Sequence, residues 1–332
     1  MNKRVPRVEA VRMSADEMSI KPERFREIIP NATLGRYYTW LIYRDDPALP
    51  PISGLRIMNR DGFLSPLGMV RMGDTPLTHQ TILPITNKTH GRGPAQYLPS
   101  ETQESAKVYE AKGTDPDVLV QYADRWARIK ESDIVDIQLD YTPYGLVVYP
   151  DCPFPGSAYL LQHLIGHGTI EGKEYKILGA CDRLVGDFSP HRLKIPMVYF
   201  SSVGIREDGK VENACFTIVG DDRFMLYCVE GEKPIALPDF DAQLKWELVP
   251  YMPDKDTYTV TEATYRFADR EIHYKAKWGF SGNCDEMQDV KGFSQSSGIW
   301  YTGPTEYKHE PDFSWVESWE ATREQLEKFS LI

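Results

Sequence analysis

From residue 133 onward, apolar and polar residues alternate with period two, and turn residues interrupt the alternation at short intervals. This alternation predicts antiparallel β-strands, because successive side chains of a strand point to opposite faces of its sheet. The clearest runs are MVYFSSVGI (197–205) and VENACFTIV (211–219), which the turn EDGK (207–210) separates. Asp-Gly between two alternating runs is typical of a β-hairpin. We therefore expect a meander of hairpins in the second half of the chain.

The segment TYTVTEATYRFADREIHYKAKW (257–278) predicts a further hairpin. After its turn, the alternation assigns one face to Ile272, Tyr274, Ala276 and Trp278, and the other face to Glu271, His273, Lys275 and Lys277. The first set is apolar and the second is charged or polar. We therefore expect one face of this hairpin to be buried and the other to be exposed.

Two segments predict helices instead. Residues 115–130 begin with a capping side chain and a proline, and they continue with large apolar residues at helical spacing. Residues 314–330 begin with Ser314 and, three residues later, Glu317, which is the pattern of a capping box. We expect one helix within the first half of the chain and one helix at its end.

The length of 332 residues favours two units over one compact core. We expect a mainly β protein made of two antiparallel β-sheet or barrel units. The N-terminal unit would span residues 1–150 and contain the helix near 115–130. The C-terminal unit would span residues 151–332 and end in the helix 314–330.

The formal net charge of −11 argues against a nucleic-acid partner, because binding to phosphates needs a basic surface. The sequence contains no run of 18 apolar residues that would predict a membrane span. The polar N-terminus lacks the apolar centre of a signal peptide, so we expect a cytoplasmic protein. Five scattered cysteines indicate neither a disulfide framework nor a zinc ribbon. Neither GxGxxG nor GxxxxGK[ST] occurs, and we expect no cofactor and no metal. The oligomeric state stays open.

The stretch GACDRLVGDFSPHR (179–192) places charged residues between predicted strands. If KILGACD (176–182) is a strand, Asp182 shares a face with apolar residues of that strand. In an apolar interior, desolvation would raise the pKa of this carboxyl and keep a proton available for acid catalysis. The alternative is a salt bridge, in which Asp182 or Asp187 pairs with Arg183 or Arg192 at the end of the strand.

Three histidines are further candidates. His163 and His167 are four residues apart, and a metal would need at least one more ligand, so we expect satisfied or exposed histidines here. His191 lies near Asp182 in the chain and has the chemistry of a proton shuttle, although it is equally compatible with a loop residue. We predict Asp182 as the general acid, with His191 or His163 as its partner.

Residues 179–220 resemble the central stretch of the lipocalin-like hydratases and cyclases, a family that includes carotenoid 1,2-hydratase-type and AttH-like proteins. The shared pattern is a glycine, a strand that ends in aspartate, a glycine-containing loop, an aromatic strand and an Asp-Gly turn. Arg183 stands where that family has histidine. The resemblance implies a calycin-like fold for both units, and lyase or isomerase chemistry.

The 12% aromatic content suits the walls of a cavity for an apolar ligand, although core packing is the favoured role for any single ring. We expect the β-barrel to bind an isoprenoid-, polyketide- or aromatic-like substrate. Together with Arg183, the substrate-binding residues would be Tyr199, Trp278 and Phe188. The reaction would be hydration, dehydration or cyclisation by proton transfer.

Two other functions remain open at this point. A non-catalytic carrier of the same fold would bind a lipid-like ligand without converting it. A carbohydrate-active enzyme would need two carboxyl groups roughly 5–10 Å apart in an aromatic cleft. The residues leave open whether the protein is catalytic at all, and we favour the enzyme.

Overall fold

The structure is a computed structural model, and it describes residues 9–10, 35–46, 48–58, 63–77, 93–94, 98–100, 108–114, 117–122, 126–131, 134–141, 147–148, 158–186, 194–233, 235–237, 239–249, 256–281, 293–302 and 312–332. For some strand residues only the backbone is described. The chain divides into two compact units. The eleven-stranded unit contains Val11–Arg71 and Leu83–Phe188, and the nine-stranded unit contains Met1–Ala10, Met72–Ile82 and Ser189–Ile332.

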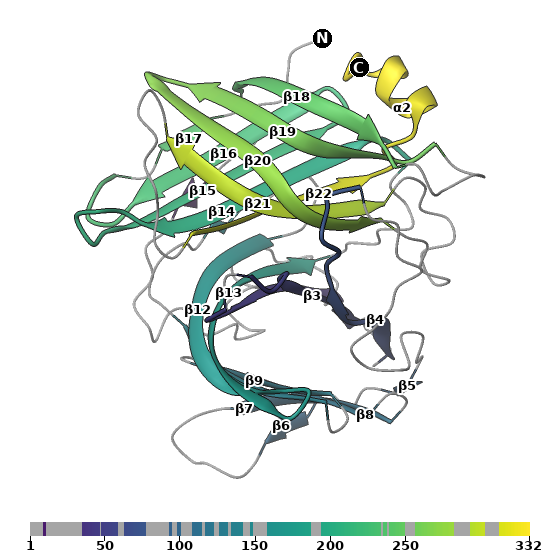
Figure 1. The fold of residues 1–332 in the computed structure, drawn as a ribbon, viewed down its shortest axis with the longest axis vertical. Helices are drawn as coiled ribbons and strands as arrows, with labels where there is room; N and C mark the ends of the chain where they lie inside the picture. The colour runs from purple at the N-terminus through teal and green to yellow at the C-terminus, as the bar shows by residue number, and fades with distance from the viewer. Residues whose placement is uncertain are drawn as a thin grey trace. The chain divides into compact units, whose positions relative to one another are not determined.

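The eleven-stranded unit is built on one antiparallel sheet that curls into a half-barrel (Figure 1). In sheet order its strands are β5 (Gly93–Pro94), β4 (Phe63–Arg71), β3 (Ile52–Met58), β2 (Gly35–Arg44), β13 (Lys173–Gly186), β12 (Ala158–Ile170), β10 (Val135–Tyr141), β9 (Trp126–Glu131), β8 (Asp117–Tyr122), β7 (Val108–Thr114) and β6 (Leu98–Ser100). The division predicted at residue 150 separates β12 and β13 from the strands with which they pair.

The helix expected over residues 115–130 is wrong, because the described part of this segment forms β8 and β9. Ile129 of β9 pairs with Ile137 of β10, and both side chains are buried. On the other face, Arg128 donates to both carboxylate oxygens of Asp136, over 2.8 and 2.7 Å. Cross-strand partners on both faces outweigh the helical spacing of the apolar residues.

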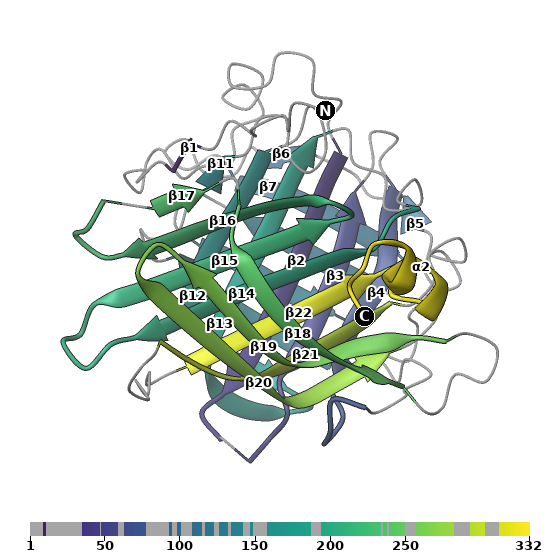
Figure 2. The same ribbon diagram turned by 90° about the horizontal axis from the view of Figure 1, so that it is seen from above.

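The nine-stranded unit also has one curled antiparallel sheet. Its strands, in order, are β17 (Ile235–Leu237), β16 (Asp222–Val229), β15 (Val211–Val219), β14 (Met197–Ile205), β22 (Asp312–Trp319), β21 (Ser294–Thr302), β20 (Arg270–Ser281), β19 (Tyr258–Phe267) and β18 (Asp241–Leu248). Figure 2 shows these strands from above. Two short strands, β1 (Glu9–Ala10) and β11 (Val147–Val148), and the helix α2 (Arg323–Lys328) complete the described elements.

The predicted fold class is confirmed: the protein is mainly β, with two curled antiparallel sheets and a C-terminal helix. The meander is confirmed as well, because β14 and β15 have the predicted bounds, and Gly209 takes the positive φ of +80° that their hairpin turn requires. The C-terminal helix is shorter than predicted. Residues 312–319 form β22 between β14 and β21, and only Arg323–Lys328 is helical.

A β-bulge in β20 changes the face on which one predicted residue lies. Ala276 pairs with Gly298 of β21, whereas Trp278 pairs with Ser297, so one residue of β20 has no counterpart. Ile272 and Tyr274 are buried on the predicted face. Because the extra residue reverses the alternation, Trp278 lies on the opposite face from them, and the predicted common face is wrong for Trp278.

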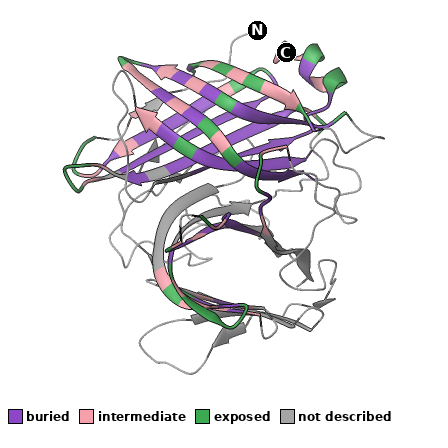
Figure 3. Ribbon diagram, viewed as in Figure 1, coloured by how far each residue is buried: buried purple, intermediate pink, exposed green. Residues whose placement is uncertain are grey.

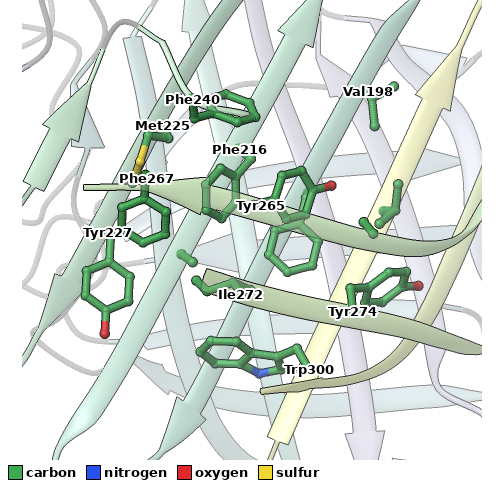
Figure 4. Close-up of a cluster of buried hydrophobic side chains, with 14 of the residues drawn as sticks. Val198, Phe216, Met225, Tyr227, Phe240, Tyr265, Phe267, Ile272, Tyr274 and Trp300 are labelled. Atoms are coloured by element: carbon green, nitrogen blue, oxygen red, sulfur yellow. The ribbon is translucent and has the colours of Figure 1, made fainter. Parts of the chain in front are cut away.

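The core of the nine-stranded unit fills the concave face of its sheet with aromatic rings (Figure 4). Phe216 and Tyr265 stack in parallel, with centroids 4.2 Å apart. Phe200 lies 5.0 Å from Tyr265 and 5.5 Å from Tyr274. Figure 3 shows that buried residues follow one another along the central strands. Because successive side chains of a strand point to opposite faces, the second face of this sheet is buried too. Within the described residues, no helix has the length and apolar character to cross a membrane.

Candidate functional site

The second face of the nine-stranded sheet carries two rows of side chains that cross it from strand to strand. Cross-strand pairing places Thr217, Tyr199, Glu317, Gln295 and Phe280 in one row, here called the Glu317 row. The same pairing places Ser201, Trp315, Ser297 and Trp278 in the adjacent row, here called the Trp315 row. All nine side chains are buried, and both rows mix polar groups with aromatic rings.

The alternation in β22 explains why these side chains share a face. Trp315, Glu317 and Trp319 are two residues apart, so all three point to this side of the sheet. Val316 lies between them on the other side and packs in the core of the unit. A strand of this pattern therefore presents a carboxyl group flanked by two indole rings.

Glu317 is held by two N–H donors, one for each carboxylate oxygen. Gln295 Nε2 donates to Oε2 over 2.6 Å, and Trp319 Nε1 donates to Oε1. Glu317 is only 4% exposed, and Gln295 is 1% exposed. Hydrogen bonds in such a dry environment are stronger than in water, and these two restrict the orientation of the carboxyl group.

Aromatic rings surround this carboxyl group. The rings of Tyr199 and Trp315 are 6.0 Å apart. Phe293 meets Trp319 edge to face at 4.9 Å, and it lies 6.0 Å from Phe280. Aromatic rings therefore lie beside Glu317 on this face, together with the groups that hold its carboxylate.

Three buried polar atoms on this face have no hydrogen-bond partner among the residues that the structure describes: Trp315 Nε1, Ser201 Oγ and Thr217 Oγ1. Each of these residues is at most 1% exposed. Buried polar atoms in proteins are nearly always paired, and exceptions require an explanation. A ligand that carries an acceptor oxygen would supply the partner.

The structure places two of the predicted substrate-binding residues on the same face of the nine-stranded sheet. Tyr199 belongs to the Glu317 row and Trp278 to the Trp315 row, with β22 and β21 between them. Lys277 Nζ lies 4.1 Å from the centroid of the Trp278 ring. The predicted Phe188 and His191 lie outside the described residues.

The backbones of His163, Asp182 and Arg183 lie in β12 and β13, and their side chains are outside the described part of the structure. His163 pairs with Ala180, and Asp182 is two residues further along β13. The positions of His163 and Asp182 therefore belong to the same face of the sheet, one diagonal step apart. Their catalytic roles stay predictions.

The described end of β13 bears on the expectation that Asp182 faces an apolar interior. Ile177 is buried, whereas Lys176 is exposed, and strand alternation gives Asp182 the face of Lys176. Further along, Leu41 pairs with Ala180 on that same face and is only 1% exposed. The face of Asp182 is thus exposed at one end of β13 and covered nearer to Asp182.

The second predicted histidine, His167, is exposed in the middle of β12. On either side of it, Gly166 and Gly168 lie so close to β10 that a Cβ would approach backbone oxygens to 2.0 and 2.3 Å. These glycines permit the close approach of two strands. Among the described residues, no three His, Cys, Asp or Glu side chains are grouped as a metal ion would require.

A second buried carboxyl group, that of Glu212, lies on the core face of the nine-stranded sheet. Tyr227 donates to Glu212, and Arg270 Nη1 donates to the Tyr227 oxygen over 3.1 Å. Burial, with the nearby Glu212 carboxylate, raises the pKa of Tyr227 above its ordinary value. The positive charge of Arg270 thus lies near the Glu212 carboxylate, with Tyr227 between them. Such an arrangement is typical of a group that stabilises the fold.

Glu317, Gln295 and Trp315 are not among the site residues that the sequence predicts. The spacing of Ser314 and Glu317 fits the capping box of a helix, although SWVESW (314–319) also alternates with period two. The alternation of Trp, Glu and Trp on one face was the available signal. Gln295 carries no such signal, because only the pairing of β21 with β22 brings it to Glu317.

No protein-family model and no curated protein matches this sequence. Among solved structures, a protein provisionally assigned as AttH from Nitrosomonas europaea has 9% sequence identity, with 88% of this chain and 94% of that chain covered, at a TM-score of 0.49. CghA has 10% identity, with 87% and 89% covered, at 0.47. Kievitone hydratase from Nectria haematococca has 9% sequence identity, with the same coverage of the two chains, at a TM-score of 0.42. Each of these chains is similar to this one over most of its length.

Proposed function

We propose that this protein is an enzyme that binds an apolar small molecule and moves protons on it, with the Glu317 carboxyl group as the acid–base group. The observation that carries the proposal is the buried Glu317, held by Gln295 and Trp319 among aromatic rings. The reaction class is hydration, dehydration or cyclisation. The resemblance of residues 179–220 to lipocalin-like hydratases and cyclases supports the same class.

A carboxyl group in this setting is suited to proton transfer. Each of its oxygens accepts one N–H, so the orientation of the carboxyl group is restricted. The aromatic rings keep water away, which strengthens electrostatic interactions within the site. A positioned acid or base of this kind accelerates a reaction by about 10²- to 10⁴-fold.

The unpartnered donors of the Trp315 row point to the type of substrate. Trp315 and Glu317 are two residues apart on one strand, which separates their Cα atoms by about 6.6 Å. A substrate oxygen that accepts from Trp315 Nε1 and Ser201 Oγ would then lie near the carboxyl group. Such donors stabilise negative charge that develops on a carbonyl or hydroxyl oxygen during proton transfer. We infer an apolar molecule that bears an oxygen group.

The test begins with native mass spectrometry of the purified full-length chain, under gentle and then denaturing conditions. We expect a co-purified hydrophobic molecule that is released on unfolding. The wild type and the variants Glu317→Gln and Asp182→Asn are then incubated with that compound. Glu317→Gln should bind it and convert it at least about 100-fold more slowly. Glu324→Gln, an exposed position on α2, is the matched control and should convert it normally.

Two outcomes would overturn the proposal. If Asp182→Asn abolishes conversion while Glu317→Gln converts normally, the acid–base group is Asp182 and not Glu317. If the wild type binds the compound and converts it in neither direction, the protein is a carrier. Because the carrier needs no aligned carboxyl group, Glu317→Gln would then leave binding unchanged and have no turnover to lose.

A further inference from the structure

Arg44, at the end of β2 in the eleven-stranded unit, is a buried cation. It is 8% exposed. Its Nη2 donates to the carbonyl oxygen of Pro50 over 2.7 Å, and its guanidinium lies 5.5 Å from the centroid of the Tyr175 ring. Its Nε is buried and has no acceptor among the described residues. Within those residues, no carboxylate forms an ion pair with Arg44.

Two further cationic side chains lie at the same end of the sheet. Lys173 Nζ lies 4.9 Å from the centroid of the same Tyr175 ring. Arg71, the last residue of β4, pairs with Glu171 in the turn between β12 and β13. Three cations and one carboxylate therefore meet at the rim of the sheet, in a chain whose net charge is −11.

The strand register places these cations on one face. Arg44 pairs with Ile177 of β13, and Tyr175 and Lys173 lie two and four residues before Ile177 on the same side. Arg71 pairs with Ile52, which in turn pairs with Ile42, two residues before Arg44. Ile42, Ile52 and Ile177 are buried, so this is the core side of the sheet. Arg71 and Lys173 remain open to solvent at its rim.

The nearest carboxylates in the chain do not neutralise Arg44. Asp45 is exposed, and its backbone N–H bonds to the carbonyl oxygen of Lys176. Asp46 Oδ1 accepts from the backbone N–H of Ala48 over 3.1 Å, within its own turn. Burial lowers the pKa of Arg44, and the like charge of Arg71 adds to this shift, whereas Tyr175, through a side-chain hydrogen bond, and the Glu171 carboxylate oppose it. A buried cation that forms no direct ion pair is costly, and an added anion removes part of that cost.

We propose that Arg44, Lys173 and Arg71 form a binding site for an oxyanion, namely the carboxylate or phosphate group of a small molecule. The unpartnered Nε–H of Arg44 supplies the directional donor, because a guanidinium matches the geometry of both oxyanions. Lys173 and Arg71 attract the anion at the solvent-exposed rim. The site lies in the other unit from Glu317, and it is independent of the function proposed above.

Isothermal titration calorimetry of the full-length chain tests this site with two probes, inorganic phosphate and acetate, each at constant ionic strength. Constant ionic strength is needed because salt screens the exposed cations. We expect one or both probes to bind the wild type at a single site. Lys173→Gln and Arg71→Gln should each weaken binding about two- to five-fold. Arg44→Lys keeps the positive charge and removes the planar set of guanidinium N–H donors. It should weaken binding about ten-fold or more.

The matched control is Lys176→Gln, an exposed position of β13 on the opposite face from Lys173. It removes the same charge and should leave binding unchanged. Binding of phosphate alone assigns a phosphate ligand, and binding of acetate alone assigns a carboxylate. If Lys176→Gln weakens binding as much as Lys173→Gln does, the anion is attracted by the overall charge of the surface. That result would overturn the proposal. Absence of binding by both probes would overturn it as well.

Discussion

Gln295 and Glu317 face each other across β21 and β22, and the Gln295 amide donates to the Glu317 carboxylate over 2.6 Å. Both side chains are buried, on a face that mixes polar groups with aromatic rings. Burial alone would disfavour a carboxyl group at this position. The hydrogen bond from Gln295 helps to keep it in one orientation. That orientation is what a proton-transfer group needs.

Removal of the amide should destabilise the fold. Gln295→Leu leaves one oxygen of the buried Glu317 without its donor, and we expect the free energy of unfolding to fall by about 1–3 kcal/mol. Urea denaturation measures this change. Gln243→Leu, at an exposed position of β18, is the control and should change stability by less than about 0.5 kcal/mol. Equal effects of the two substitutions would refute a specific role for the bond.

The bulge in β20 should be sensitive to a single methyl group. A Cβ at Gly298 would lie 1.9 Å from the carbonyl oxygen of Lys275, next to the bulge that turns Trp278 toward Ser297. Gly298→Ala should therefore cost about 1–3 kcal/mol of stability and disturb Trp278. Thermal unfolding and near-ultraviolet circular dichroism report the two effects. An unchanged melting temperature would contradict this close approach.

The stacked pair in the core should contribute strongly to stability. Phe216→Ala removes a ring that stacks on Tyr265 and contacts further aromatic rings, and we expect a loss of about 3–5 kcal/mol. Ile299→Ala, at a position 51% exposed, is the comparison and should cost less than about 0.5 kcal/mol. Chemical denaturation distinguishes the two variants. A loss below about 1 kcal/mol for Phe216→Ala would mean that this core is not packed as described.

Alkaline pH should weaken the fold through its buried tyrosines. Burial raises the pKa of Tyr265 well above its ordinary value, and it raises the pKa of Tyr274 as well. Below the unfolded-state pKa of about 10, both states keep the phenolic proton and stability is unaffected. Above it, only the unfolded chain releases the proton, so stability falls by about 1.4 kcal/mol per pH unit for each such tyrosine.

Tyr265→Phe isolates one of these contributions. Its hydroxyl has no hydrogen-bond partner among the described residues, so the substitution should be nearly neutral at pH 7. At pH 11 the variant should be more stable than the wild type by about 1 kcal/mol. Urea denaturation at the two pH values provides the comparison. Parallel losses in both proteins would show that Tyr265 ionises as freely in the fold as outside it.

Local sequence signals predicted the meander well. The hairpin between β14 and β15 followed from alternation on both sides of an Asp-Gly turn, and both signals are local. The segment 115–130 failed because its apolar residues suit a helix and a hairpin alike, and pairing with β10 decides between them. Such pairing joins distant parts of the chain, and no single segment encodes it.

The candidate site was harder to predict for the same reason. Tyr199 and Trp278 were selected for their chemistry, and the sheet places them on one face only because of the bulge before Trp278. Glu317 was assigned to a helix cap, since its spacing from Ser314 fits that motif. Its function depends on Gln295, whose position follows from the register of β21 against β22.

Deuterium incorporation tests the role of Glu317 most directly. The compound that co-purifies with the wild type is incubated with the enzyme in D₂O, and its mass and proton spectrum are followed over time. We expect the wild type to introduce deuterium at one carbon position, and Glu317→Gln to do so at least about 100-fold more slowly while it still binds the compound. Equal incorporation by both proteins would show that Glu317 does not transfer the proton.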